Sequence, residues 1–174
     1  MQPSQVLEHA YQRITQVVRQ SLDGLAADAL TWQPEPDANH IGWLVWHLTR
    51  IQDDHIAELA ERPQVWQQND WPTRFGFASD TLETGHGHTA AQVAALRPES
   101  VTTLLDYHER VASGTQAFLG SLTAEDLDRI IDTSYDPPVT MGVRLVSVIA
   151  DNLQHAGQAR YLRGIYERTV DPAN

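Results

Sequence analysis

The chain has no cysteine and no lysine among its 174 residues. Without cysteine it can form no disulfide and has no Cys nucleophile, so a bound metal would need His, carboxylate and water ligands. All 12 basic side chains other than histidine are arginines, against 23 acidic residues, and the net charge is −11. Because binding to nucleic acid or to an anionic membrane requires clustered basic residues, this composition argues against both partners.

Long apolar runs are also missing. No stretch approaches the roughly 18 residues that a membrane span needs, and Met1–Gln5 lacks the pattern of a secretory signal. We therefore expect a cytoplasmic location. Hydrophobic residues make up 41% of the chain and charged residues 20%, which is ordinary for a globular protein. The length predicts a single domain over 1–174 with a sizeable core.

Four segments carry apolar residues at helical spacing, and none has a convincing strand pattern. These segments cover about 4–22, 40–62, 98–119 and 141–167. Four long helices without strands predict an all-α fold, a four-helix bundle.

The connection between the second and third predicted helices, about 63–97, is long and weakly patterned. A region of this length inside a compact domain predicts a capping or functional loop, and it could cross the bundle. Its aromatic residues could belong to the core or wall a small apolar pocket. They are Trp66, Trp71, Phe75 and Phe77.

Asp151 and His155 lie four residues apart in the last predicted helix. On a helix this spacing places them about 40° apart around the axis and roughly 6 Å along it. Val148 and Leu162 continue the same stripe, so the two ionisable groups share a face with residues that favour burial. Buried ionisable groups need a partner, and a cation satisfies both. His47, on the apolar side of the second helix, is the candidate third ligand, with a hydrogen-bonded core histidine as the alternative.

Two imidazoles and one carboxylate leave a coordination position for water or substrate. Zinc in such a site acidifies water or a thiol, whereas iron(II) supports oxygen chemistry, and spacing alone does not choose between them. A di-iron bundle would need a Glu-x-x-His motif on each of two helices. The chain has one match, Glu83 to His86, in a glycine-rich stretch, so we reject that site.

Arg50 and His88 are the candidates for further catalytic roles. Arg50, one turn after His47, could pair with a substrate carboxylate or form a salt bridge with Asp53 or Asp54. His88 could bind metal or approach a substrate, although its Gly-His-Gly-His context favours a flexible, solvated loop. Three histidines without a partner pattern are expected at the surface: His9, His40 and His108.

The stretch from Asn39 to Arg50, followed by Asp-Asp-His at 53–55, resembles the second helix of the DinB-like superfamily, in particular an actinobacterial branch. Residues 85–89 and 154–159 resemble the same branch, and the match spans nearly the whole chain. The resemblance implies a four-helix bundle that holds a divalent metal, usually zinc or nickel. The implied ligands are a histidine of the second helix and two residues four apart on the last: His47, Asp151 and His155.

Members of this superfamily include mycothiol and bacillithiol S-transferases and a mycothiol-dependent maleylpyruvate isomerase. The resemblance implies a metal-dependent S-transferase or thiol-dependent isomerase. The metal, zinc first with nickel or iron as alternatives, would activate a low-molecular-weight thiol for attack on a small electrophile under the 64–97 segment. Relatives often dimerise, so a homodimer is compatible. The alternatives are a non-catalytic bundle that binds a metal or small ligand, and a metal-assisted hydrolase.

Overall fold

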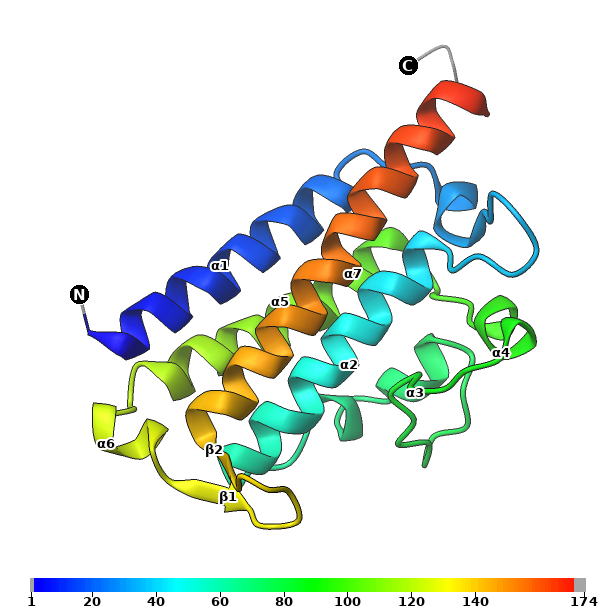
Figure 1. Cartoon of the computed structure of the whole chain (residues 1–174). Helices are drawn as coiled ribbons and strands as arrows, with labels where there is room; N and C mark the ends of the chain where they lie inside the picture. Colours follow the sequence, from blue (N-terminus) through cyan, green and yellow to red (C-terminus); the bar gives the residue numbers. More distant parts are fainter. Residues whose placement is uncertain (1, 171–174) are drawn as a thin grey trace.

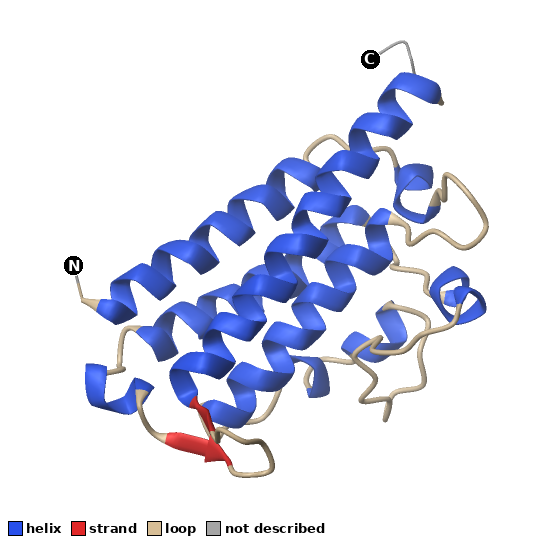
Figure 2. Ribbon diagram, in the orientation of Figure 1, coloured by secondary structure: helices blue, strands red, loops and turns tan. Residues whose placement is uncertain are grey.

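The computed structural model describes residues 2–170, so residue 1 and residues 171–174 of the expected domain lie outside it. Four long helices form a bundle, which confirms the predicted all-α fold (Figures 1 and 2). They are α1 (Pro3–Leu22), α2 (Ile41–Leu59), α5 (Val101–Leu119) and α7 (Met141–Thr169). The connections contain η1 (Ala27–Thr31), η2 (Val65–Gln67), α3 (Trp71–Arg74), α4 (Ala90–Ala95) and α6 (Ala124–Leu127).

Two of the long helices begin at residues of the capping type. The side chains of Ser100 and Thr140 accept hydrogen bonds from backbone N–H groups in the first turns of α5 and α7. In the bundle, α1 and α2 each pack against both α5 and α7. None of the described helices is long and apolar enough to cross a membrane.

Helix α2 is buried on nearly every side. All ten residues from Ile41 to Arg50 are buried, although one apolar stripe would bury only part of each turn. α5 and α7 cover α2 on the side of the bundle, and the connection that contains α3 and α4 lies on its other side (Figure 1). α2 is therefore the central element of the fold.

The connection from 63 to 97 is part of the hydrophobic core. Trp66 and Trp71 are at most 1% exposed, and their rings lie 5.3 and 5.2 Å from that of Tyr107 on α5. Phe77 stacks on Trp46 of α2 at 5.2 Å. Of the two alternatives for these aromatic residues, the structure supports the core.

A small antiparallel sheet corrects the expectation of no strands. β1 (Ile130–Asp132) pairs with β2 (Val139–Thr140), with Ile130 opposite Thr140. Strands of three and two residues are too short to show the alternating pattern by which a strand is recognised in a sequence. The hairpin leads directly into α7, because Thr140 is both the last strand residue and the helix cap.

His40 and His108 are fully buried, so their predicted surface positions are wrong, whereas His9 is exposed as expected. His40 precedes α2, where its Nδ1 accepts from the backbone N–H of Trp43 at 3.0 Å and its Nε2 donates to the carbonyl of Val93 at 3.0 Å. Val93 is 53 residues away along the chain, so no local pattern could indicate this partner.

The tautomer of His108 follows from its neighbours. The Thr49 hydroxyl donates to a backbone carbonyl, so it accepts from His108 Nδ1 at 2.9 Å. Nε2 then accepts from the hydroxyl of Thr15 at 3.2 Å. Burial of this neutral ring lowers the pKa of His108 to about 4.

This shift predicts a pH-dependent stability. Between pH 4 and pH 6.5 the unfolded chain binds a proton at His108 and the native chain does not. The free energy of unfolding should therefore fall by roughly 3 kcal/mol as the pH drops through this window. His108→Gln, which removes the titrating group, should show a smaller fall in urea denaturation at pH 7 and about pH 4.5. His9→Gln, at an exposed position, is the control, and an unchanged slope in His108→Gln would contradict the assignment.

Candidate metal centre

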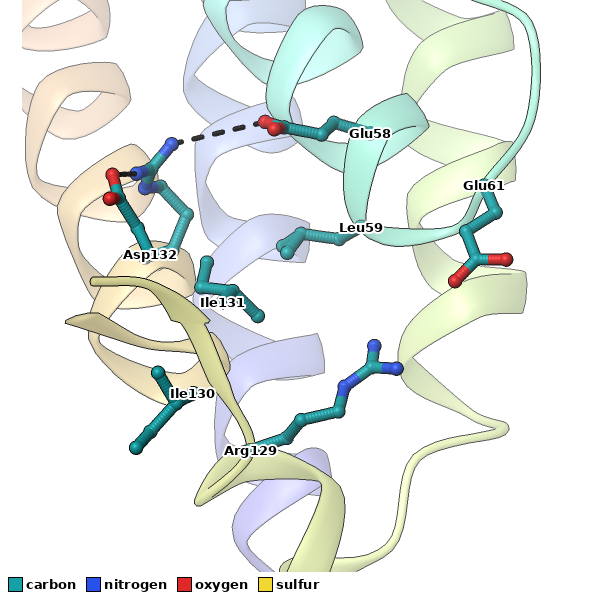
Figure 3. A pocket seen from close by; sticks show the side chains of 8 residues that line it. Glu58, Leu59, Glu61, Arg129, Ile130, Ile131 and Asp132 are labelled. Carbon is teal, nitrogen blue, oxygen red and sulfur yellow. Dashed lines mark hydrogen bonds and ion pairs between the residues drawn. The ribbon is translucent and has the colours of Figure 1, made fainter. Parts of the chain in front are cut away.

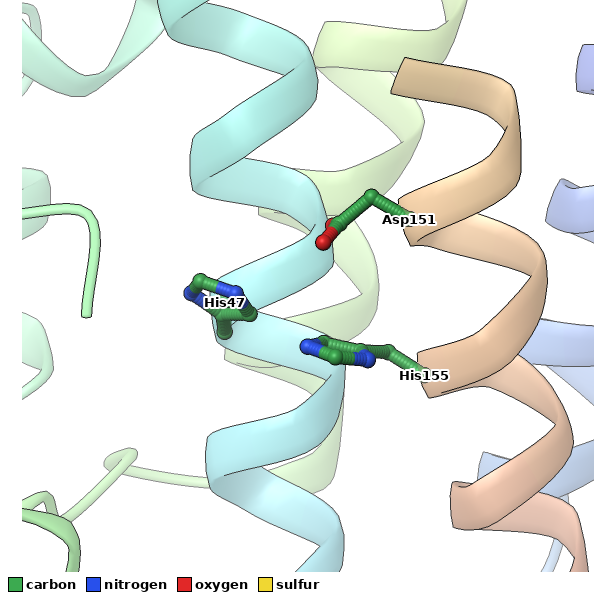
Figure 4. Close-up of side chains that lie close together, drawn as sticks. All are labelled: His47, Asp151 and His155. Atoms are coloured by element: carbon green, nitrogen blue, oxygen red, sulfur yellow. The ribbon is translucent and has the colours of Figure 1, made fainter. Parts of the chain in front are cut away.

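The three predicted ligands come together at the contact between α2 and α7. One ligand atom from each of His47, Asp151 and His155 lies within 4.8 Å of the other two (Figure 4). Within residues 2–170 this is the one group of three or more His and acidic side chains with such spacing. His47 is 6% exposed, and the other two are half-buried. The group could hold a divalent metal ion.

The residue that follows Asp151 fixes the rotation of α7. The buried Asn152 donates from Nδ2 to Gln52 Oε1 on α2 at 2.8 Å. Gln52 Nε2 in turn donates to Thr115 Oγ1 on α5 at 2.8 Å. Because this chain of hydrogen bonds joins three helices, Asp151 and His155 are held on the side of α7 that faces His47.

His47 is set in one tautomer by a backbone partner. Its Nδ1 donates to the carbonyl of Thr84 at 2.5 Å, so Nε2 carries the lone pair. This is the usual arrangement of metal-binding histidines, whose second nitrogen donates to a carbonyl or carboxylate. Burial lowers the pKa of His47, which favours the neutral form that binds metal. The indole of Trp43 stacks on the ring at 4.6 Å.

Two polar atoms of the group indicate whether it could hold a cation. Asp151 Oδ2 and His155 Nδ1 are buried, and neither has a hydrogen-bond partner within the described part of the chain. Leaving such groups buried and unpaired costs free energy, which a bound cation would offset. Two imidazoles and one carboxylate suit zinc, nickel or iron. The residues therefore fit a divalent metal.

His88 supports the site from the connection rather than lying in a flexible, solvated loop. Its Nε2 donates to Glu83 Oε2 at 2.8 Å, and its Nδ1 accepts from Trp43 Nε1 at 3.2 Å. With both ring nitrogens occupied, His88 holds Trp43 in its stack on His47. Its neighbour His86 is exposed, as a solvated loop predicts.

Gly85 lets the backbone of the connection lie directly on His47. Its φ is +90°, and a Cβ there would lie 2.8 Å from Trp46 Cζ3 and 2.9 Å from His47 Nδ1. Any larger residue would push the Thr84 carbonyl away from the imidazole. The sequence did not predict this contact between Gly85 and His47. Its only sign there is the alternation of glycine and histidine over residues 85–88.

Arg50 forms the predicted salt bridge and is not available to a substrate. Its side chain is fully buried, and Nη1 lies 3.6 Å from Asp53 Oδ2. Nε and Nη2 donate to the carbonyls of Glu83 and Leu82 at 3.0 and 3.1 Å. Arg50 therefore anchors the connection to α2. Asp54 accepts from Gln64 Nε2 at 2.6 Å and lies outside the metal group.

Gly85→Ala tests the role of this backbone contact. The variant should bind zinc roughly 10–100-fold more weakly, the usual cost of losing a partner that orients a ligand. Zinc affinity can be measured by competition with a chromogenic chelator. Gly87→Ala is a matched control, because Gly87 has a φ of +73° and a Cβ added there would meet no atom within 4 Å. Equal zinc affinities in the two variants would contradict the proposed contact.

Asp151→Asn tests the unpaired carboxylate. Zinc at about 100 times its dissociation constant should stabilise the wild type by about 2.7 kcal/mol, which corresponds to a rise in Tm of roughly 5–10 °C. The variant should lose most of this rise in a thermal melt, because the charged ligand is gone. Asp106→Asn changes the same charge at an exposed position on α5 and should keep it. A full zinc effect in Asp151→Asn would exclude Asp151 as a ligand.

Comparison with known proteins identifies the family of the chain. The profile of the DinB superfamily matches residues 10–159. No curated protein matches the chain. Among solved structures, a conserved protein from Enterococcus faecalis is 30% identical, with a TM-score of 0.85, and the alignment covers 94% of this chain and 96% of that one. The extent of both matches shows that the chain belongs to the DinB superfamily.

Proposed function

We propose that the chain is a divalent-metal-dependent thiol S-transferase. The metal would be held by His47, Asp151 and His155, and the substrates would be a low-molecular-weight thiol and a small electrophile. The observation that carries the proposal is the grouping of His47, Asp151 and His155, in which Asp151 Oδ2 and His155 Nδ1 are buried without a hydrogen-bond partner in the described part of the chain and His47 uses Nδ1 for a backbone carbonyl. Membership of a superfamily that includes mycothiol and bacillithiol S-transferases supports the choice of thiol chemistry.

A divalent cation at this site would lower the pKa of a thiol that binds it, so that the nucleophilic thiolate forms near neutral pH. The protein contributes in three ways. His47 keeps its proton on Nδ1, where the Thr84 carbonyl accepts it, and presents a lone pair at Nε2. The Asp151 carboxylate supplies a negative charge beside the imidazoles of His47 and His155. Trp43 covers one face of His47 and excludes water from it.

The proposed reaction balances without a redox partner. The thiol S–H bond breaks and its proton passes to solvent. A bond then forms between sulfur and the electrophilic carbon, whose leaving group departs with its electron pair. Three protein ligands leave a position for the thiol, which is the feature that separates a catalytic site from a closed structural one. Zinc is the proposed metal, because its chemistry requires no change of oxidation state.

The absence of cysteine permits a direct assay. The chain has no thiol of its own, so an alkylating probe such as monobromobimane can react only with the thiol of the added substrate. With mycothiol or bacillithiol as the thiol, zinc-loaded wild type should form the conjugate at least about tenfold faster than the metal-free protein. His155→Ala should be as slow as the metal-free protein, because two ligands hold zinc poorly. His86→Ala, at an exposed position, should behave as wild type.

Two outcomes would contradict the proposal. Breakdown of carboxylic esters or amides by the zinc-loaded protein without any thiol would identify a metal-assisted hydrolase. Stoichiometric zinc without acceleration of either reaction would identify a bundle that binds metal and is not an enzyme. Zinc content measured by mass spectrometry on the same samples distinguishes a failed reaction from an empty site.

A further inference from the structure

A second feature of the contact between α2 and α7 lies one turn from the metal centre. It is a pocket of about 250 Å³, here called the apolar pocket. Leu44 of α2 and Leu162 and Ile165 of α7 line it, and Pro34 and Ala38 of the connection between α1 and α2 close one side.

The apolar pocket continues the metal centre along both helices. Leu44 precedes His47 by three residues, and Gln158, which also lines the pocket, follows His155 by three. Three residues correspond to about 4.5 Å of helix, and residues at this spacing lie on the same side. The pocket and the three candidate ligands therefore lie along the same side of the contact between α2 and α7, about one helical turn apart.

The lining of the apolar pocket is uncharged. Its polar groups are the amides of Asn39 and Gln158 and the hydroxyl of Tyr161, and none of the described residues that line it is acidic, basic or histidine. An ion of either sign would therefore find no charged partner among these residues, whereas the leucine and isoleucine side chains offer apolar contact.

The other end of the same helix pair has the opposite character. A second pocket lies there, beyond the metal centre, where Arg144 of α7 is within 3.4 Å of Asp132 and 3.9 Å of Glu58 (Figure 3). The metal centre thus has a charged pocket on one side and an apolar pocket on the other. Of the two, the apolar pocket has no internal ion pairs that a ligand would have to displace.

We propose that the apolar pocket binds the uncharged, apolar body of the electrophile, and that it sets the substrate class. This inference rests on the proposed function. A volume of about 250 Å³ lies below the range for drug-sized ligands, so the fitting body is one aromatic ring or a short alkyl chain. Neutral benzyl-type electrophiles should be preferred over charged ones of similar size.

The first test is binding of toluene, which has no atom that ligates metal. In NMR titrations of the zinc-loaded protein, toluene should shift the amide signals of Leu44 and Leu162. Ile165→Asp places a charge in the half-buried lining and should weaken toluene binding at least about tenfold, the size of effect that one apolar contact has in such pockets. Leu153→Asp makes a comparable change at an exposed site on α7 outside the pocket and should bind as wild type.

The second test is the choice between electrophiles. With the same thiol, zinc-loaded wild type should favour benzyl bromide over iodoacetate in kcat/KM, each corrected for its uncatalysed rate. Ile165→Asp should reduce this preference at least about tenfold and leave zinc content unchanged. Leu153→Asp should retain the wild-type preference.

The outcomes separate the two proposals. Toluene binding at Leu44 and Leu162 without any thiol transfer would support the pocket and overturn the S-transferase function. Thiol transfer with no toluene binding, and with an unaltered preference in Ile165→Asp, would overturn the pocket and leave the function standing. Sedimentation of a dimer that Ile165→Asp dissociates, again without toluene binding, would show that a second copy of the chain covers the pocket, and would also overturn the inference.

Discussion

The burial of α2 on nearly all sides is the constraint on which the rest of the structure depends. Since its first ten residues are all buried, the charged and hydroxyl groups there need partners inside the protein. Arg50 pairs with Asp53 and with carbonyls of the connection, and Thr49 pairs with His108. The bonds of Arg50 hold the 63–97 segment on α2, so a stretch with little regular structure becomes part of the core.

At the candidate metal centre this rule is only half fulfilled. His47 has a partner on one side, the Thr84 carbonyl, and turns its other nitrogen toward α7. There it meets Asp151 and His155, each of which has a buried atom without a hydrogen-bond partner in the described part of the chain. Local violations of packing rules are expected at functional sites, where they persist because a ligand removes the cost. The same helix contact extends to an uncharged pocket, which would join metal chemistry to substrate selection.

The sequence predicted the features that depend on regular spacing. The four long helices and the shared face of Asp151 and His155 follow from periodicity, which acts over one or two turns. It misplaced His40 and His108 and missed the carbonyl partners of Arg50, because the groups that bind these side chains lie far along the chain: Val93, Thr15 and the carbonyls of residues 82–83. The short β-hairpin escaped notice since strands this short carry no measurable pattern.

By itself the sequence determined the fold class, the absence of thiol ligands and the three side chains able to hold a metal, because residue chemistry and helical spacing are local properties. Only the tertiary structure decided which nitrogen of His47 is free, why Gly85 is needed and where an uncharged pocket adjoins the site. These features depend on the close approach of segments that lie far apart along the chain, such as His47 and Thr84, which are 37 residues apart. Such contacts are set by the packing of the whole core around α2, which no local pattern records.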